Sequence, residues 1–196
     1  MPVEHLTAEE GQYLLKLARA AIERAVHGEL TTPLTAEAPT PQLEAPGAAF
    51  VTLHTRHGDL RGCIGSLVAR RSLVEDVHDN ALAAAFSDPR FPPLAAPELP
   101  DIVVEVSVLT APDPLDFDGP DDLIRKLRPN IDGVIIEHGW NRATFLPQVW
   151  EQLPSPEQFL SNLCYKARLP VNAWRWPDLK VSIYQVEKFE EEHEDS

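Results

Sequence analysis

The feature that most constrains the fold of this chain is one order of secondary-structure patterns that occurs in both halves. In the first half, a hairpin pattern precedes a helix that a capping box opens at Ser72, and an alternating strand follows over residues 102–109. In the second half, a hairpin pattern, a capped helix that opens at Ser155 and a strand over residues 179–186 follow in the same order. Either a duplicated unit or the common local patterns of α+β proteins explains this repetition, and both explanations stay open.

The predicted fold class is therefore α+β, a single compact domain of two related hairpin, helix and strand repeats with antiparallel sheets and flanking helices. We predict a first lobe over residues 7–110, a second lobe over 111–189 and a solvated acidic tail over 190–196. If the repeats are duplicated, they pack about a pseudo-twofold axis. The groove between them is then the natural place for a ligand.

Turn and capping residues predict where the individual elements begin and end. A capping box at Thr7 opens the first helix, which Gly28 can end. The first hairpin is predicted to turn at His57-Gly58, which joins a strand over residues 49–55 to a return strand over residues 59–67. The second hairpin is predicted to join residues 133–137 to residues 143–146.

Composition and charge narrow the class of protein. The chain has 196 residues, of which 43% are apolar and 24% charged, as in soluble globular proteins. Its net charge of −14 argues against non-specific nucleic-acid binding. No apolar run has the length of a membrane span, and the first residues lack the pattern of a signal peptide. Because two distant cysteines make no disulfide framework, we predict a cytoplasmic location with no membrane contact.

One predicted strand, Leu60–Gly65, carries a cysteine between two glycines. Glycine weakens a strand and is tolerated where a backbone bends or where a ligand comes close. Alternation places the side chains on two faces, with Arg61, Cys63 and Gly65 on one and the core residues Leu60, Gly62 and Ile64 on the other. A cation next to a thiol is one of the features that activates it. Cys63 is thus a candidate nucleophile beside Arg61.

The predicted turn places a histidine near this cysteine. With the turn at His57-Gly58, His54 pairs with Arg61 and Thr52 pairs with Cys63, so that His54 is a diagonal neighbour of the thiol. His54 or Glu105 would then move protons. The plainer interpretation is that Cys63 is a small buried hydrophobic residue and that the glycines accommodate a bulge or close packing.

Other candidate sites have weaker patterns. Asp88 and Arg90 lie on a proline-stiffened loop that either holds an anionic ligand or forms a rigid corner through an Asp88–Arg90 bond. The spacing of the histidines and cysteines matches no zinc pattern, so we predict no metal site. We also predict no cofactor. Cys164 lies on the apolar stripe of a predicted helix and is expected in the core.

Four blocks of the chain resemble the signature blocks of the AMMECR domain family, and the match runs from Thr7 to Phe189. These blocks are residues 60–65, 87–94, 104–109 and 143–150. The resemblance implies a compact α+β fold of two related β/α repeats, in a prokaryotic stand-alone member of the family. It further implies a functional association with Memo-type and radical S-adenosylmethionine proteins. The family supplies no reaction, and its suspected functional block transfers only to Leu60, Arg61, Gly62, Cys63, Ile64 and Gly65.

The leading functional hypothesis is an enzyme, or a component of an enzyme system, that acts on a small molecule. Cys63 would be the nucleophile or the covalent tether, and Arg61 would stabilise the thiolate or bind an anionic group. Asp88 and Arg90 would shape the rim of the site. The alternative is a non-catalytic adaptor that binds another protein, in which the Leu60–Gly65 block is structural.

Overall fold

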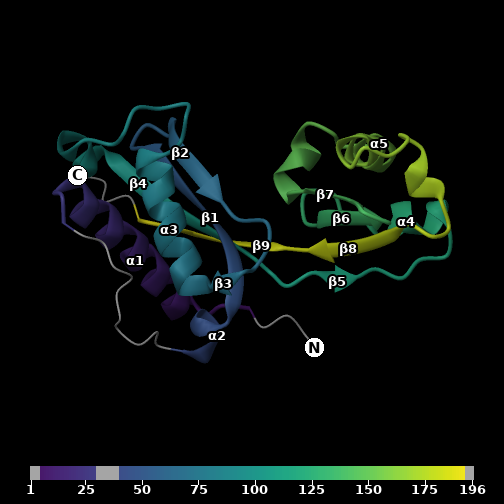
Figure 1. The fold of residues 1–196 in the computed structure, drawn as a ribbon, viewed down its shortest axis with the longest axis horizontal. Coiled ribbons are helices and arrows are strands. Elements are labelled where there is room, and N and C mark those ends of the chain that lie inside the picture. The colour runs from purple at the N-terminus through teal and green to yellow at the C-terminus, as the bar shows by residue number, and fades with distance from the viewer. Residues whose placement is uncertain (1–4, 30–39, 193–196) are drawn as a thin grey trace. The chain divides into compact units, whose positions relative to one another are not determined.

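The computed structural model describes residues 5–29 and 40–192. The chain folds into two compact units. Unit 1 contains the first part of the chain up to Thr110 together with the segment that begins at Glu187, and unit 2 contains Ala111–Val186. Both units combine helices with antiparallel sheets (Figure 1). The predicted α+β class is confirmed.

The sheet of unit 1 has the strand order β2-β1-β4-β9, and the short strand β3 also pairs with β1. Its strands are β1 (Pro46–Thr55), β2 (Leu60–Gly65), β3 (Arg71–Ser72), β4 (Ile102–Leu109) and β9 (Val186–Glu190). The β2–β1 and β1–β4 pairs are antiparallel, so the hairpin lies directly beside the strand that follows the next long helix. As a result, β2 is an edge strand whose outer side faces away from β1.

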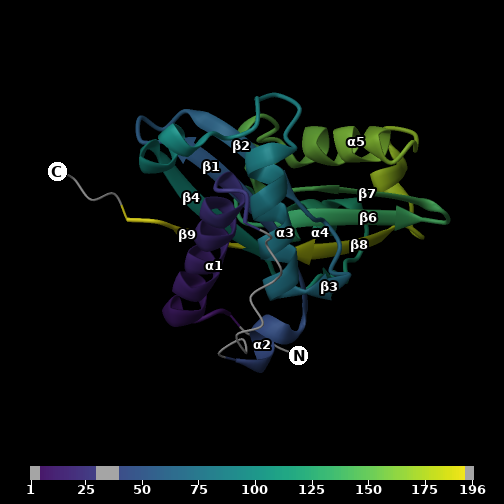
Figure 2. The same cartoon turned by 60° about the vertical axis from the view of Figure 1, so that its left-hand side comes forward.

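Helices cover one face of this sheet. α1 (Ala8–Val26) and α3 (Leu73–Phe86) pack against each other and against the strands, and both begin with the predicted capping boxes, at Thr7 and Ser72 (Figures 1 and 2). The shorter helices are α2 (Pro41–Glu44) and the 3-10 helix η1 (Ala96–Asp101). The core between helices and sheet includes Leu14, Ile22, Val51, Leu53, Val77, Val104 and Val106. The opposite face of the sheet carries the polar side chains described below.

Unit 2 has a smaller sheet of order β5-β8-β6-β7. Its strands are β5 (Asp113–Pro114), β6 (Gly133–His138), β7 (Asn141–Phe145) and β8 (Lys180–Tyr184). Its helices are α4 (Pro120–Lys126), α5 (Pro156–Lys166), η2 (Pro147–Glu151) and η3 (Ala173–Arg175). The core of this unit contains Trp150 stacked on Phe159, and Cys164 is fully buried in it, as predicted.

The two units share one strand connectivity. In each, a hairpin is followed by a capped helix and then by a strand that pairs with the first strand of the hairpin, which yields β2-β1-β4 in unit 1 and β7-β6-β8 in unit 2. The sheet of unit 1 also contains β9 and the short strand β3, and the sheet of unit 2 also contains β5. The repeated order read from the sequence is thus present in the fold, whereas the pseudo-twofold axis stays a prediction.

The last strand of the chain belongs to a different unit from the one predicted. Residues from Glu187 onward belong to unit 1, because β9 pairs with β4, and the predicted second lobe is too long by those residues. Glu191, placed in the frayed tail by the sequence analysis, instead accepts hydrogen bonds from the Arg19 guanidinium and the Val104 amide. Local composition suggested a solvated tail, but the tertiary ion pair with α1 holds this glutamate in place.

None of the helices within the described residues is long and apolar enough to cross a membrane.

Candidate functional site around Cys63

The first hairpin has a longer turn than predicted. The Gly58 amide donates to the Thr55 carbonyl, and Gly58 has φ +88, a left-handed conformation that favours glycine. The register then shifts between Leu53 and His54, so that Leu53 pairs with Gly62 but His54 pairs with Leu60. The predicted His54–Arg61 pair is therefore wrong, because a bulge leaves Arg61 without a direct partner on β1. The predicted Thr52–Cys63 pair is confirmed.

Cys63 lies on the face of the sheet opposite the helices. Its cross-strand partner Thr52 sits between the core residues Val51 and Leu53, and therefore points away from the core. Thr52 also pairs with Glu105 on β4. Because directly paired residues share a face, Cys63, Thr52 and Glu105 form a polar row across three strands. We call these three residues, with the neighbouring His54, the polar row.

The thiol of Cys63 has a hydroxyl neighbour, and its backbone is held from outside the sheet. The Thr52 hydroxyl donates to Cys63 Sγ at 3.2 Å. The Cys63 amide donates to Asp88 Oδ2 at 2.9 Å, and its carbonyl accepts from Arg90 Nη2 at 3.4 Å. Asp88 and Arg90 thus satisfy the backbone groups that an edge strand otherwise leaves unpaired.

Asp88 and Arg90 form the rigid corner that was one of the two predicted alternatives. The Asp88 side chain is 2% exposed and accepts from Arg90 Nε and Nη2 at 3.0 and 2.7 Å. This pairing with the Arg90 guanidinium, helped by the Cys63 amide, holds the pKa of Asp88 well below its ordinary value. Arg90 is 54% exposed, and its Nη1 group makes no hydrogen bond to the described residues. The corner therefore keeps donors available for an anionic group.

Asp88 should make the stability of the protein depend on acidic pH. A carboxyl whose pKa is lower in the folded state stabilises the fold above its unfolded pKa of about 3.9, and this stabilisation is lost as pH falls toward the folded value. We expect the difference in unfolding free energy between the wild type and Asp88→Asn to be constant between about pH 5 and 7 and to shrink below about pH 4. Denaturant unfolding across this range measures it, and a difference that stays constant down to about pH 2 contradicts it.

The Glu105 carboxylate contacts the remaining polar groups of this face. Its side chain is 10% exposed, and its carboxylate lies 3.5 Å from His54 Nε2 and 3.3 Å from Lys188 Nζ of β9. The Ser107 hydroxyl donates to the other carboxylate oxygen. With Nε2 directed at Glu105, the Nδ1 atom of His54 is buried and has no hydrogen-bond partner among the described residues. A carboxylate that orients one nitrogen of an imidazole leaves the other as a proton acceptor.

The Arg61 guanidinium does not lie beside the Cys63 thiol, where the sequence predicted it. The bulge directs its guanidinium to Glu98 of η1, at 2.8 Å from Nε, and to the Pro92 carbonyl, at 2.9 Å from Nη2. The Phe91 ring centroid lies 5.8 Å from the guanidinium carbon. This ion pair holds the pKa of Glu98 below its ordinary value. Arg61 therefore anchors the loop that carries Asp88 and Arg90, and the cation next to Cys63 is Arg90.

Three other members of the Leu60–Gly65 block, Gly62, Ile64 and Gly65, have packing roles. Gly62 faces the helices, where an added Cβ would lie 2.2 Å from the Ala84 carbonyl oxygen of α3. Gly65 lies beneath the Phe50 ring, its cross-strand partner. Ile64 packs against the core as predicted. Leu60 does not, because it sits beside the bulge and is 38% exposed.

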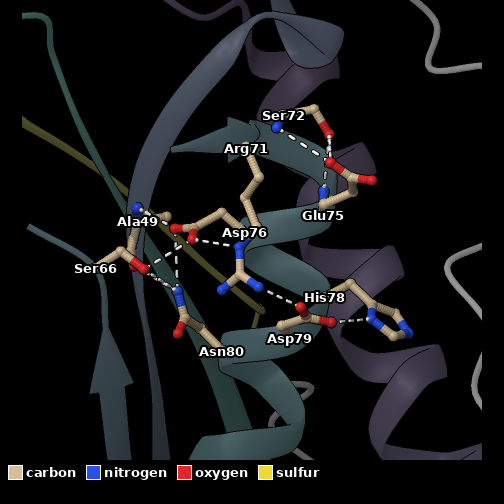
Figure 3. Close-up of polar contacts among 9 residues, drawn as sticks. All are labelled: Ala49, Ser66, Arg71, Ser72, Glu75, Asp76, His78, Asp79 and Asn80. Atoms are coloured by element: carbon tan, nitrogen blue, oxygen red, sulfur yellow. Dashed lines mark hydrogen bonds and ion pairs between the residues drawn. The ribbon is translucent and has the colours of Figure 1, made fainter. Parts of the chain in front are cut away.

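A buried polar cluster fixes the far end of the hairpin (Figure 3). Asp76 on α3 is 2% exposed and accepts from the Ala49 amide at 2.9 Å, the Ser66 hydroxyl at 2.7 Å and Arg71 Nε at 2.9 Å. Asn80 also donates to it and to the Ala49 carbonyl. The cluster joins α3 to the start of β1 and to the residue after Gly65, so it sets where the Cys63 strand lies.

Sequence reasoning missed the partners that come from distant segments. It placed Thr52 beside Cys63 without a role, and it omitted Lys188 and Glu98. The alternation of β1 was a usable signal for Thr52. Within residues 5–29 and 40–192, no group of three or more His, Cys, Asp or Glu side chains is placed to hold a metal ion.

Comparisons with known proteins identify the family to which this chain belongs. The family model described as AMMECR1 matches residues 15–189. A protein of Methanothermobacter thermautotrophicus is 41% identical over 192 residues, covering 95% of this chain and 97% of its own length. One of Thermococcus onnurineus is 42% identical over 196 residues, covering 94% and 92%. The crystal structure of an uncharacterised protein from Pyrococcus horikoshii is similar with a TM-score of 0.75 and 38% identity, covering 96% of this chain and 94% of its own. The chain therefore belongs to the AMMECR1 family, as its signature blocks indicated.

Proposed function

We propose that this protein is an enzyme, or a component of an enzyme system, that acts on a small molecule through Cys63. The observation that carries the proposal is the polar row, in which the partly buried Cys63 lies on the face of the sheet opposite the helices, in line with Thr52 and Glu105. A cysteine that serves only as packing belongs among the apolar residues of the core, as Cys164 does.

Three members of the row have roles in this proposal. Cys63 is the nucleophile, His54 accepts a proton at Nδ1, and Glu105 orients the imidazole through Nε2. Lys188 and Ser107 hold the Glu105 carboxylate in place. Arg90 offers its free Nη1 group to an anionic part of the ligand. Because the Cys63 amide already binds Asp88, it is not available to stabilise a developing negative charge on the ligand.

The remaining parts of the proposal rest on the sequence. They are the cytoplasmic location and the association with Memo-type and radical S-adenosylmethionine proteins. The family resemblance supports the association, and the composition supports the location.

Alkylation of the folded protein tests the reactivity of Cys63. We expect iodoacetamide to modify one cysteine per chain at neutral pH, and Cys63→Ser to abolish this labelling. Cys164 is the internal control, because it is fully buried and burial raises the pKa of its thiol. Unfolding in denaturant exposes both cysteines. Failure of Cys63 to label in the folded wild type would remove the basis of the proposal.

A non-catalytic adaptor is the alternative, and two observations favour it. Gly62 and Gly65 are explained by packing alone, and Trp140, in the turn between β6 and β7, is fully exposed. Exposed tryptophans are common at the centre of protein interfaces. On this alternative, Cys63→Ala lowers the melting temperature and Cys63 resists labelling, whereas a nucleophile labels readily.

A further inference from the structure

Thr52 holds the central position of the polar row. It is the direct cross-strand partner of both Cys63 and Glu105. Since the Cys63 amide and carbonyl point outward to Asp88 and Arg90, Thr52 and Cys63 form a pair without mutual backbone hydrogen bonds. Side chains approach each other most closely in such pairs. This closeness explains the 3.2 Å distance between Thr52 Oγ1 and Cys63 Sγ.

The Thr52 hydroxyl is the side-chain group that donates a hydrogen bond to Cys63 Sγ in the described part of the chain, because the charged groups nearby are paired elsewhere. Arg90 contacts the Cys63 backbone, and the other charged groups of the region are Asp88, His54, Glu105, Lys188 and Arg61. Asp88 is bound to Arg90, Arg61 to Glu98, and Glu105 to His54 and Lys188. Elsewhere in the row, the Nδ1 atom of His54 is buried without a hydrogen-bond partner among the described residues, while the side chain as a whole is 27% exposed.

We propose that Thr52 belongs to the reactive site, where its hydroxyl donates a hydrogen bond to the ionised sulfur of Cys63. The inference rests on the proposed function, because it assigns Thr52 a role at the same sulfur. A hydrogen bond to a charged acceptor is stronger than one to a neutral acceptor, so the hydroxyl increases the fraction of ionised sulfur. It also draws electron density from that sulfur and makes it a weaker nucleophile.

The rate at which iodoacetamide alkylates Cys63 depends on both the ionised fraction and the nucleophilicity of the sulfur. The thiol first loses its proton to solvent, directly or through His54, a sulfur electron pair then forms a bond to the methylene carbon, and iodide leaves with the electrons of the carbon–iodine bond. The rate is the product of the ionised fraction and the nucleophilicity of the ionised sulfur. Removing the hydroxyl therefore changes the two factors in opposite directions.

The opposite effects predict rate profiles that cross. We expect Thr52→Val to react about threefold more slowly than the wild type near neutral pH, because the lost hydrogen bond to the ionised sulfur outweighs the gain in its nucleophilicity. At a pH high enough to ionise the thiol in both proteins, Thr52→Val should react about threefold faster. A change in access to the sulfur would alter the rate in one direction at every pH.

The experiment compares single-site alkylation rates from about pH 6 to 11. Thr52→Ser keeps the hydroxyl and should reproduce the wild-type profile, and Thr52→Ala provides a second variant without it. Thr144→Val is the matched control, since the Thr144 hydroxyl pairs with the Tyr184 hydroxyl in unit 2 and has no role at the sulfur. Circular dichroism confirms the fold of each variant.

The outcomes separate the inference from the proposed function. Profiles of Thr52→Val and Thr52→Ala that stay parallel to the wild type overturn the role of Thr52 while leaving a reactive Cys63. A wild type that does not label at all overturns the proposed function itself. Crossed profiles that Thr52→Ser restores support the inference.

Discussion

Asp76→Asn should lower the free energy of unfolding by about 3–5 kcal/mol, because it leaves several buried donors and the Arg71 guanidinium without their carboxylate. Both Asp76 oxygens accept hydrogen bonds, from Ser66 and Arg71 on one and from Ala49 and Asn80 on the other. An amide of the same shape turns one acceptor into a donor that faces other donors (Figure 3). Denaturant unfolding monitored by circular dichroism measures the loss.

Asp79→Asn is the matched control for this prediction. Asp79 lies one turn further along α3 and also contacts Arg71, but its side chain is 46% exposed. An exposed ion pair contributes less than about 1 kcal/mol, so the control should lose little stability. Equal losses in the two variants would show that Arg71 alone, and not the buried carboxylate, organises the cluster.

Gly62→Ala should destabilise the protein by about 3 kcal/mol, because the added methyl has no room. Its Cβ would lie 2.2 Å from the Ala84 carbonyl oxygen, which is backbone within α3 and cannot rotate away. Either α3 or β2 has to move, and both carry parts of the core. Thermal and denaturant unfolding measure the effect. The displacement of β2 should also slow Cys63 alkylation.

Gly65→Ala is the comparison within the same strand. Its Cβ would lie 2.2 Å from the Phe50 ring, which belongs to a side chain and can rotate, unlike a backbone group. We expect a loss of about 1 kcal/mol, smaller than that of Gly62→Ala. If Gly65→Ala is the more damaging of the two, then the stacked Phe50 ring, rather than the approach of α3 to β2, limits what this strand tolerates.

Local signals in the sequence predicted the elements that depend on neighbouring residues. The capping boxes at Thr7 and Ser72 marked the first turns of α1 and α3, because each uses side chains three residues apart. Alternation placed Cys63 on the face away from the core, and this prediction depended only on its own strand. The repeated order of hairpin, helix and strand was also predictable, because it too follows from patterns of neighbouring residues.

The partners of the candidate site were not predictable in this way. A bulge at Arg61 moved its guanidinium from the thiol to Glu98, and the glycines of the block allowed a bulge without showing where it would fall. Asp88 reaches the Cys63 amide from a loop that follows α3. Lys188 reaches Glu105 from the last strand of the chain, which the predicted lobes assigned to the other repeat.

By itself, then, the amino-acid sequence determined the α+β class, the repeated strand order, the capped helices and the face on which the Cys63 thiol lies. Only the tertiary structure decided which charged groups surround that thiol. The physical reason is distance along the chain. Periodicity and capping act over a few residues, whereas the contacts of Arg61, Asp88 and Lys188 depend on a strand register and on loops that only the packed core brings together.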